Sequence, residues 1–165
     1  MLEFNMFLRR MNTDNYQAKL NNAAQMIAKA DYTVFLGLGT SGSLSEYATK
    51  YFVNTGLRSF VISDPFQAVQ VQGMGNVVAV IMSVSGETEQ VVNKELEFKA
   101  GGAKIISITN NEDCTVAKLA DYQLSYNLVN EWSKQYPLEN LTTQLPVLAI
   151  LEILAHKSID YHLKK

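Results

Sequence analysis

Residues 32–43 read YTVFLGLGTSGS, an apolar strand-like run followed by a loop rich in glycine and hydroxyl groups, at which a helix-like run begins. The same order recurs at residues 77–88, VVAVIMSVSGET, where residues 83–88 form the loop. A glycine-rich turn at a helix start directs backbone N–H groups and the positive end of the helix dipole at one point, which suits an anion. Clustered Ser and Thr hydroxyls add neutral donors there. Two such loops in one small domain predict a phosphate-binding pocket.

Strand-like and helix-like patterns alternate along the rest of the chain, which favours a parallel α/β sheet. The strand-like runs are nearly continuous in Val, Ile, Leu and Phe, as expected when helices cover both faces of a sheet. We predict a three-layer, doubly wound, five-stranded parallel sheet with the flavodoxin-like order 2-1-3-4-5. In that order the loops after strands 1 and 3 face each other across one crevice. The other expected strands are 59–62, 104–108 and 122–124, and the expected helices between strands are 43–54, 65–71, 87–100 and 115–119.

Composition limits the class of protein. The 165 residues, 47% of them hydrophobic, fit one globular domain over residues 1–165 with a sizeable core. With 14 basic and 16 acidic residues, the chain lacks the basic character of a nucleic-acid-binding surface. The single cysteine, the missing signal peptide and the short apolar runs predict a cytoplasmic protein. No cluster of His, Cys and carboxylates has metal-ligand spacing, so we expect neither a metal nor a cofactor.

The two ends of the domain carry separate expectations. Residues 1–30 are predicted to hold a linker and then a helix beginning at Asp14. Residues 142–163 contain the last helix, which is apolar on nearly all its faces and must therefore be buried. Because little chain is left to cover it, we favour a homodimer or higher homo-oligomer interface over a role within one chain.

The first loop also matches G-x-G-x-x-G, the fingerprint of dinucleotide-binding folds, and Asp64 lies near the position of a ribose-binding acid. Two features count against that interpretation. Hydroxyl side chains occupy the loop where dinucleotide binders mainly need backbone, and the second loop is also specialised for anions. Asp64-Pro65 is more typical of a turn or helix start, and Glu87 of a favourable position near the positive end of a helix dipole.

The two loops, GLGTSG at residues 37–42 and SVSGET at residues 83–88, resemble those of the SIS (sugar isomerase) domain family. The likeness runs from about residue 23 to residue 156, and the second loop is the more specific motif. In that family the matching hydroxyls hold the phosphate of a phosphosugar, and residues of the first loop contact the phosphate or the sugar. The resemblance therefore implies a phosphosugar site made of Gly39, Thr40, Ser41, Ser83, Ser85, Gly86 and Thr88.

Within the family, the chain is most similar to the C-terminal effector domain of RpiR-type transcriptional regulators. That resemblance implies a phosphosugar sensor, with DNA bound only through a helix-turn-helix domain that is absent from this chain. A small phosphosugar aldose–ketose isomerase is the alternative, because Glu152 and His156 on the last helix could supply a base and an assisting imidazole. The local pattern does not match the enzymes well enough to transfer those roles, so no catalytic residue is assigned.

Overall fold

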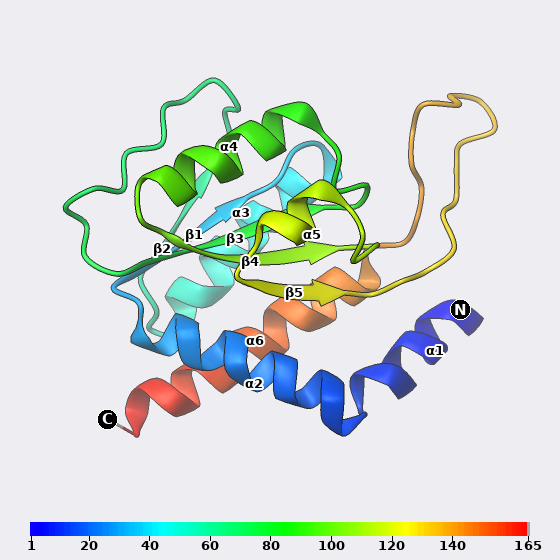
Figure 1. Ribbon diagram of the computed structural model, residues 1–165. Coiled ribbons are helices and arrows are strands. Elements are labelled where there is room, and N and C mark those ends of the chain that lie inside the picture. The colour runs from blue at the N-terminus through cyan, green and yellow to red at the C-terminus, as the bar shows by residue number, and fades with distance from the viewer. Residues whose placement is uncertain (165) are drawn as a thin grey trace.

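The computed structural model describes residues 1–164 and has a five-stranded parallel sheet in the order β2-β1-β3-β4-β5 (Figure 1). This confirms the predicted strand order and the doubly wound α/β class. The winding of the chain reverses between the neighbouring strands β1 and β3. The loops after these two strands therefore lie next to each other at the carboxyl end of the sheet. The strands are β1 (Tyr32–Leu36), β2 (Ser59–Ile62), β3 (Val77–Ser83), β4 (Lys104–Thr109) and β5 (Tyr122–Ser125).

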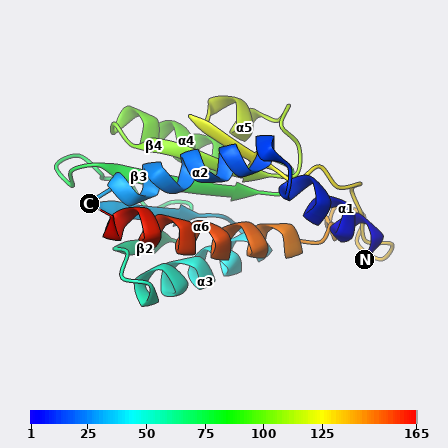
Figure 2. The same cartoon turned by 90° about the horizontal axis from the view of Figure 1, so that it is seen from below.

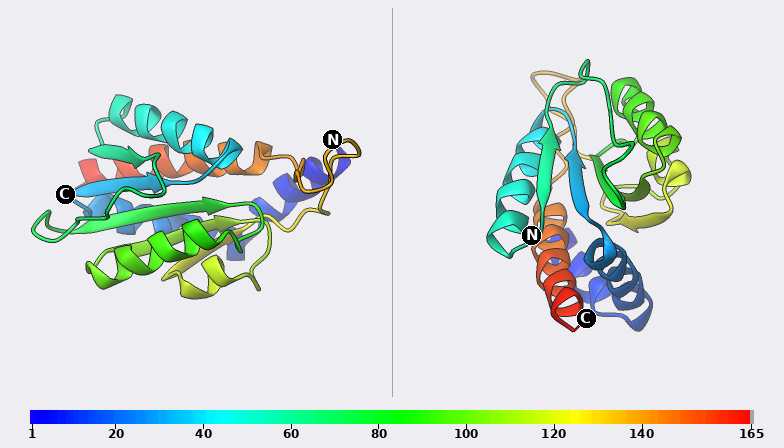
Figure 3. Two further views of the ribbon diagram at one scale, coloured as in Figure 1. Left: turned by 90° about the horizontal axis from the view of Figure 1, so that it is seen from above. Right: turned by 90° about the vertical axis from the view of Figure 1, so that its left-hand side faces the viewer.

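Both faces of the sheet are covered, as the continuous apolar strands predict. Successive residues of β1 alternate between two core clusters, with Val34 and Leu36 in one and Phe35 in the other. Helices α4 (Glu89–Ala100) and α5 (Thr115–Leu119) cover the first face, and the remaining helices cover the second (Figure 3). Those remaining helices are α1 (Leu2–Met11), α2 (Asp14–Lys29), α3 (Thr40–Asn54) and α6 (Leu145–Leu163).

Helix α6 lies between α2 and α3 along the sheet face, as Figure 2 shows. Its residues Ile150, Leu151 and Leu154 are buried in the core together with Leu20 and Ile27 of α2. The helix is therefore buried, as its composition requires, but its own chain supplies most of the cover. The premise that little chain is left to cover it is wrong, and the homodimer stays a prediction without that support.

The N-terminal segment is more regular than expected. Residues 2–11 form helix α1 rather than a linker, and the Arg10 guanidinium donates a hydrogen bond to the carbonyl oxygen of Tyr126 after β5. Helix α2 begins at Asp14, but its N-cap is Thr13, whose hydroxyl oxygen accepts the backbone N–H of Tyr16 at 3.4 Å. None of the helices within residues 1–164 is apolar and long enough to cross a bilayer.

The helix expected at residues 65–71 does not form, and this prediction is wrong. Asp64 accepts the backbone N–H of Phe66 at 2.8 Å, which makes a side-chain-closed turn that competes with a helical one. The segment is held in place by α4 instead, because Lys94 donates to the carbonyl oxygen of Gln67 at 2.6 Å. Long-range contacts therefore replace the local helix, and Asp64 is an exposed turn residue.

Candidate functional site

The loop between β1 and α3 is a tight turn around two glycines. Gly39 has φ +59° and is the N-cap of α3, so the helix begins directly at Thr40. Gly37 packs so closely against the first turn that a Cβ there would lie 2.7 Å from the backbone of Ser41. This close approach brings Thr40 and Ser41 to the carboxyl end of β1, with backbone N–H groups at the positive end of α3.

The loop between β3 and α4 is shaped by its own hydroxyls. Ser83 Oγ accepts the backbone N–H of Gly86 at 2.9 Å, and Ser85 Oγ accepts that of Glu87 at 3.2 Å. Both oxygens act as acceptors within the loop, so both O–H groups stay available to donate to a ligand. Thr88 is the N-cap of α4 and makes no side-chain capping bond, which leaves its hydroxyl available as well.

The two loops meet in one cavity of about 350 Å³ at the carboxyl end of the sheet. Six of the seven predicted site residues line it; Gly86 does not. Gly86 instead shapes the loop: its φ is +66°, and a Cβ there would lie 2.1 Å from Cys114 Sγ. Besides the six predicted residues, the lining comprises Leu38, Met82, Val84, Val91, Trp132, Leu138, Glu139, Asn140 and Leu141.

Among residues 1–164, the lining of this cavity contains no Lys or Arg, and Glu139 is its only charged residue. An anion here would be held by neutral hydroxyls, backbone N–H groups and the positive ends of α3 and α4. Glu87 is not part of the lining. Its carboxylate accepts the backbone N–H and the hydroxyl of Thr115 at 2.8 and 2.7 Å, at the start of α5, and these bonds hold its pKa below the usual value.

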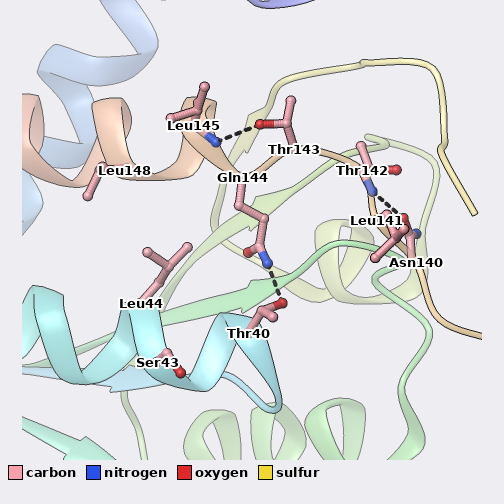
Figure 4. Close-up of a pocket in the computed structure, with 10 residues that line it drawn as sticks. All are labelled: Thr40, Ser43, Leu44, Asn140, Leu141, Thr142, Thr143, Gln144, Leu145 and Leu148. Atoms are coloured by element: carbon pink, nitrogen blue, oxygen red, sulfur yellow. Dashed lines mark hydrogen bonds between the residues drawn. The ribbon is translucent and has the colours of Figure 1, made fainter. Parts of the chain in front are cut away.

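Gln144 joins the first loop to α6 and was not predicted. Its amide nitrogen donates to Thr40 Oγ1 at 2.5 Å (Figure 4). Its amide oxygen accepts from Ser41 Oγ at 3.1 Å. The contact links the candidate anion site to the N-terminus of α6. The only sequence signal was the position of Gln144 directly before that helix, because its partners lie more than 100 residues away.

A second cavity, of about 480 Å³, adjoins the first, since Thr40, Asn140 and Leu141 line both; Figure 4 shows the residues around it. Leu44 of α3 and Leu145 and Leu148 of α6 form its apolar part, and Thr40 lines both cavities. The second cavity contains none of the predicted hydroxyls of the β3–α4 loop. It is therefore a less suitable anion site, despite its larger volume.

A family model described as the SIS domain matches residues 26–154, most of the chain. The chain belongs to the SIS domain family. This SIS domain is 26% identical over 131 residues to an uncharacterised HTH-type transcriptional regulator of Clostridium perfringens, a match that covers 78% of this chain and 46% of the relative. It is 29% identical over 127 residues to an arabinose 5-phosphate isomerase of Escherichia coli, with 74% and 38% covered. The chain thus spans less than half the length of these relatives.

Solved structures give the same fold. An Escherichia coli protein in complex with a sugar phosphate has a TM-score of 0.76 at 23% identity, with 98% of this chain and 85% of that chain covered. The sugar isomerase domain of an RpiR transcription factor from Sphaerobacter thermophilus has a TM-score of 0.74 at 13% identity, with 97% and 85% covered. The solved structures and the family model thus agree on the fold of a SIS domain.

The two candidate catalytic groups of α6, Glu152 and His156, line neither of the two cavities described above. Glu152 Oε1 accepts from the Tyr47 hydroxyl at 2.6 Å, and this bond raises the pKa of Tyr47 to about 12. His156 Nε2 lies 2.9 Å from the Tyr51 hydroxyl. The side chains of Glu152 and His156 thus both contact tyrosine hydroxyls of α3. Within residues 1–164, no group of His, Cys, Asp and Glu side chains is arranged to hold a metal ion.

Proposed function

We propose that this SIS domain is a phosphosugar-binding sensor domain of an RpiR-type transcriptional regulator. The observation that carries the proposal is the single cavity in which the hydroxyls of Thr40, Ser41, Ser83, Ser85 and Thr88 meet at the starts of two helices. The sugar phosphates in the names of a relative and of a similar structure support this ligand class. The HTH-type relative supports the regulatory role.

In this proposal, binding of a ligand in the cavity affects α6 through Gln144. A phosphate would compete for the Ser41 hydroxyl proton, which Ser41 Oγ now donates to the Gln144 amide oxygen. Thr40 Oγ1 accepts from the Gln144 amide nitrogen, so the Thr40 hydroxyl proton is free to join the same phosphate. A shift of α6 would alter how two copies of the chain meet, and a DNA-binding domain elsewhere in the protein would respond. Such coupling requires that the ligand bind the two arrangements with different affinity. Light scattering with and without ligand tests the homodimer; a monomer in both states contradicts it.

A thermal-shift screen of pentose and hexose phosphates tests the ligand class. At a concentration 100-fold above its Kd, a ligand raises the free energy of unfolding by about 2.7 kcal/mol, which for a domain of this size means a Tm increase of roughly 5–10 °C. The same sugars without phosphate serve as controls and should leave the Tm unchanged. If no sugar phosphate raises the Tm, the proposed function is wrong.

A small phosphosugar isomerase is the second candidate, and one observation favours it. Glu139 is a carboxylate that lines the cavity, so it is better placed than Glu152 to move a proton between adjacent sugar carbons. Proton NMR of a bound sugar phosphate in D₂O separates the two functions. Deuterium appearing at the carbon next to the carbonyl means catalysis, and its absence over hours supports the sensor.

A further inference from the structure

Residues 131–142 form an arm, and five of its residues, Trp132 and 138–141, line the cavity. The two sides of the arm are joined by backbone hydrogen bonds from Leu141 N–H to the Glu131 carbonyl oxygen at 2.7 Å and from Ser133 N–H to that of Glu139 at 2.9 Å. These bonds flank an isolated antiparallel bridge between Trp132 and Asn140. The gold-to-orange segment in Figures 1 and 3 extends beyond the end of the sheet toward which the strands point. The arm therefore lies on the same side as the two loops.

The base of the arm is fixed to the sheet. Asn110, directly after β4, donates from its amide to the carbonyl oxygen of Leu128 at 2.8 Å and to Asn130 Oδ1 at 3.0 Å, and it accepts the N–H of Leu128 at 2.7 Å. At the other end, Thr142 Oγ1 accepts the N–H of Glu131 at 2.8 Å. The first bonds tie the arm to the end of β4, and the last one closes its base, next to Trp132 in the cavity lining.

Trp132 lines the cavity with half of its surface exposed, at 52%, and its indole has no hydrogen-bond partner among residues 1–164. A large apolar ring at the edge of a polar cavity costs free energy unless something covers it. The hydroxyl loops on the opposite side select a phosphate. The ligand part that reaches Trp132 must then offer apolar C–H groups to the ring and hydroxyls to Glu139. A sugar has both, whereas inorganic phosphate has no C–H groups.

We propose that Trp132 binds the sugar part of the ligand: its ring covers the C–H face of the carbohydrate while the two loops hold the phosphate. This inference rests on the proposed function and assigns the sugar part of the ligand to the arm as its contact. It makes the arm the element that distinguishes a phosphosugar from inorganic phosphate.

Trp132 is the only tryptophan of the chain, so intrinsic fluorescence reports on this position alone. The probes are inorganic phosphate and the sugar phosphate that stabilises the wild type most in the thermal-shift screen. Binding of the sugar phosphate should shift the wavelength of the Trp132 emission maximum and change its intensity, until the site is saturated. Inorganic phosphate should leave the emission unchanged while displacing the sugar phosphate in competition.

Variants separate recognition from a merely structural role. Trp132→Ala should weaken binding of the sugar phosphate about 10-fold and leave the affinity for inorganic phosphate unchanged, whereas Trp132→Phe should retain affinity within threefold. Tyr136→Ala is the matched control, because Tyr136 lies on the same arm, is 62% exposed and does not line the cavity.

The outcomes distinguish this inference from the proposed function. A sugar phosphate that binds without changing the Trp132 emission, or that binds Trp132→Ala as tightly as the wild type, overturns the role of Trp132 and leaves the phosphosugar site standing. An equal loss for inorganic phosphate also overturns it, since the effect would then come from a displaced arm. If no sugar phosphate binds at all, both proposals fail.

Discussion

Replacing Ser85 and Thr88 together with alanine should weaken sugar-phosphate binding by at least 100-fold. Both hydroxyl protons are available to a ligand, since Ser85 Oγ only accepts within the loop and Thr88 makes no capping bond. A hydrogen bond to a charged group contributes about 1.5–3 kcal/mol, and the loss of two corresponds to roughly 3 kcal/mol or more. Isothermal titration calorimetry of wild type and variant measures the difference in Kd.

Ser43→Ala is the matched control for this experiment. Ser43 is an exposed hydroxyl in the first turn of α3, and it lines the second cavity but not the one between the loops. Its removal should leave the Kd within twofold of wild type. An unchanged Kd in the Ser85, Thr88 variant would contradict the assignment of the phosphate to the β3–α4 loop.

Glu95 should make the fold less stable as the pH rises. It lies fully buried on α4, and neither carboxyl oxygen has a hydrogen-bond partner among the described residues. Burial raises its pKa to about 8; the Lys99 ammonium opposes this rise, and the Asp121 carboxylate adds to it. Between the unfolded pKa of about 4.3 and this value, the folded state holds a proton that the unfolded state has lost.

Rising pH therefore favours unfolding over this range, and the free energy of unfolding falls between about pH 4 and pH 8 because of Glu95. The loss approaches 1.4 kcal/mol per pH unit in the middle of the range, or roughly 4 kcal/mol in all. Glu95→Gln removes the titration and keeps the shape. In denaturant unfolding at pH 5 and pH 8, the free energy of unfolding of the variant should increase relative to that of the wild type as the pH rises. Parallel pH profiles of the two proteins would refute the prediction.

The sequence predicted the site loops well because their chemistry is local. A loop of glycine and hydroxyl residues between an apolar strand and a helix can be recognised within about ten residues, and both loops occur where the pattern placed them. The strand order followed from the alternation of elements, since few topologies satisfy parallel pairing with right-handed crossovers. The helix predicted at 65–71 failed because the Asp64 turn and contacts with α4 outweighed a weak local tendency.

Elements that depend on distant partners were not predictable in this way. Gln144 is an ordinary polar residue until folding brings it to Thr40 and Ser41, and no local pattern around Trp132 indicates that this residue lines a cavity. Likewise, the sequence shows that α6 must be buried but not that α2 covers it.

The sequence alone thus determined the sheet, its order and the chemistry of the two loops, because strand composition and turn residues act over short distances. Only the tertiary structure decided which side chains close the cavity opposite those loops. Glu139 and Trp132 reach it because the β4 end holds the arm through Asn110. Glu152 is kept away because its helix turns it toward Tyr47. Such placements arise from contacts between segments far apart in the chain, which residue patterns do not encode.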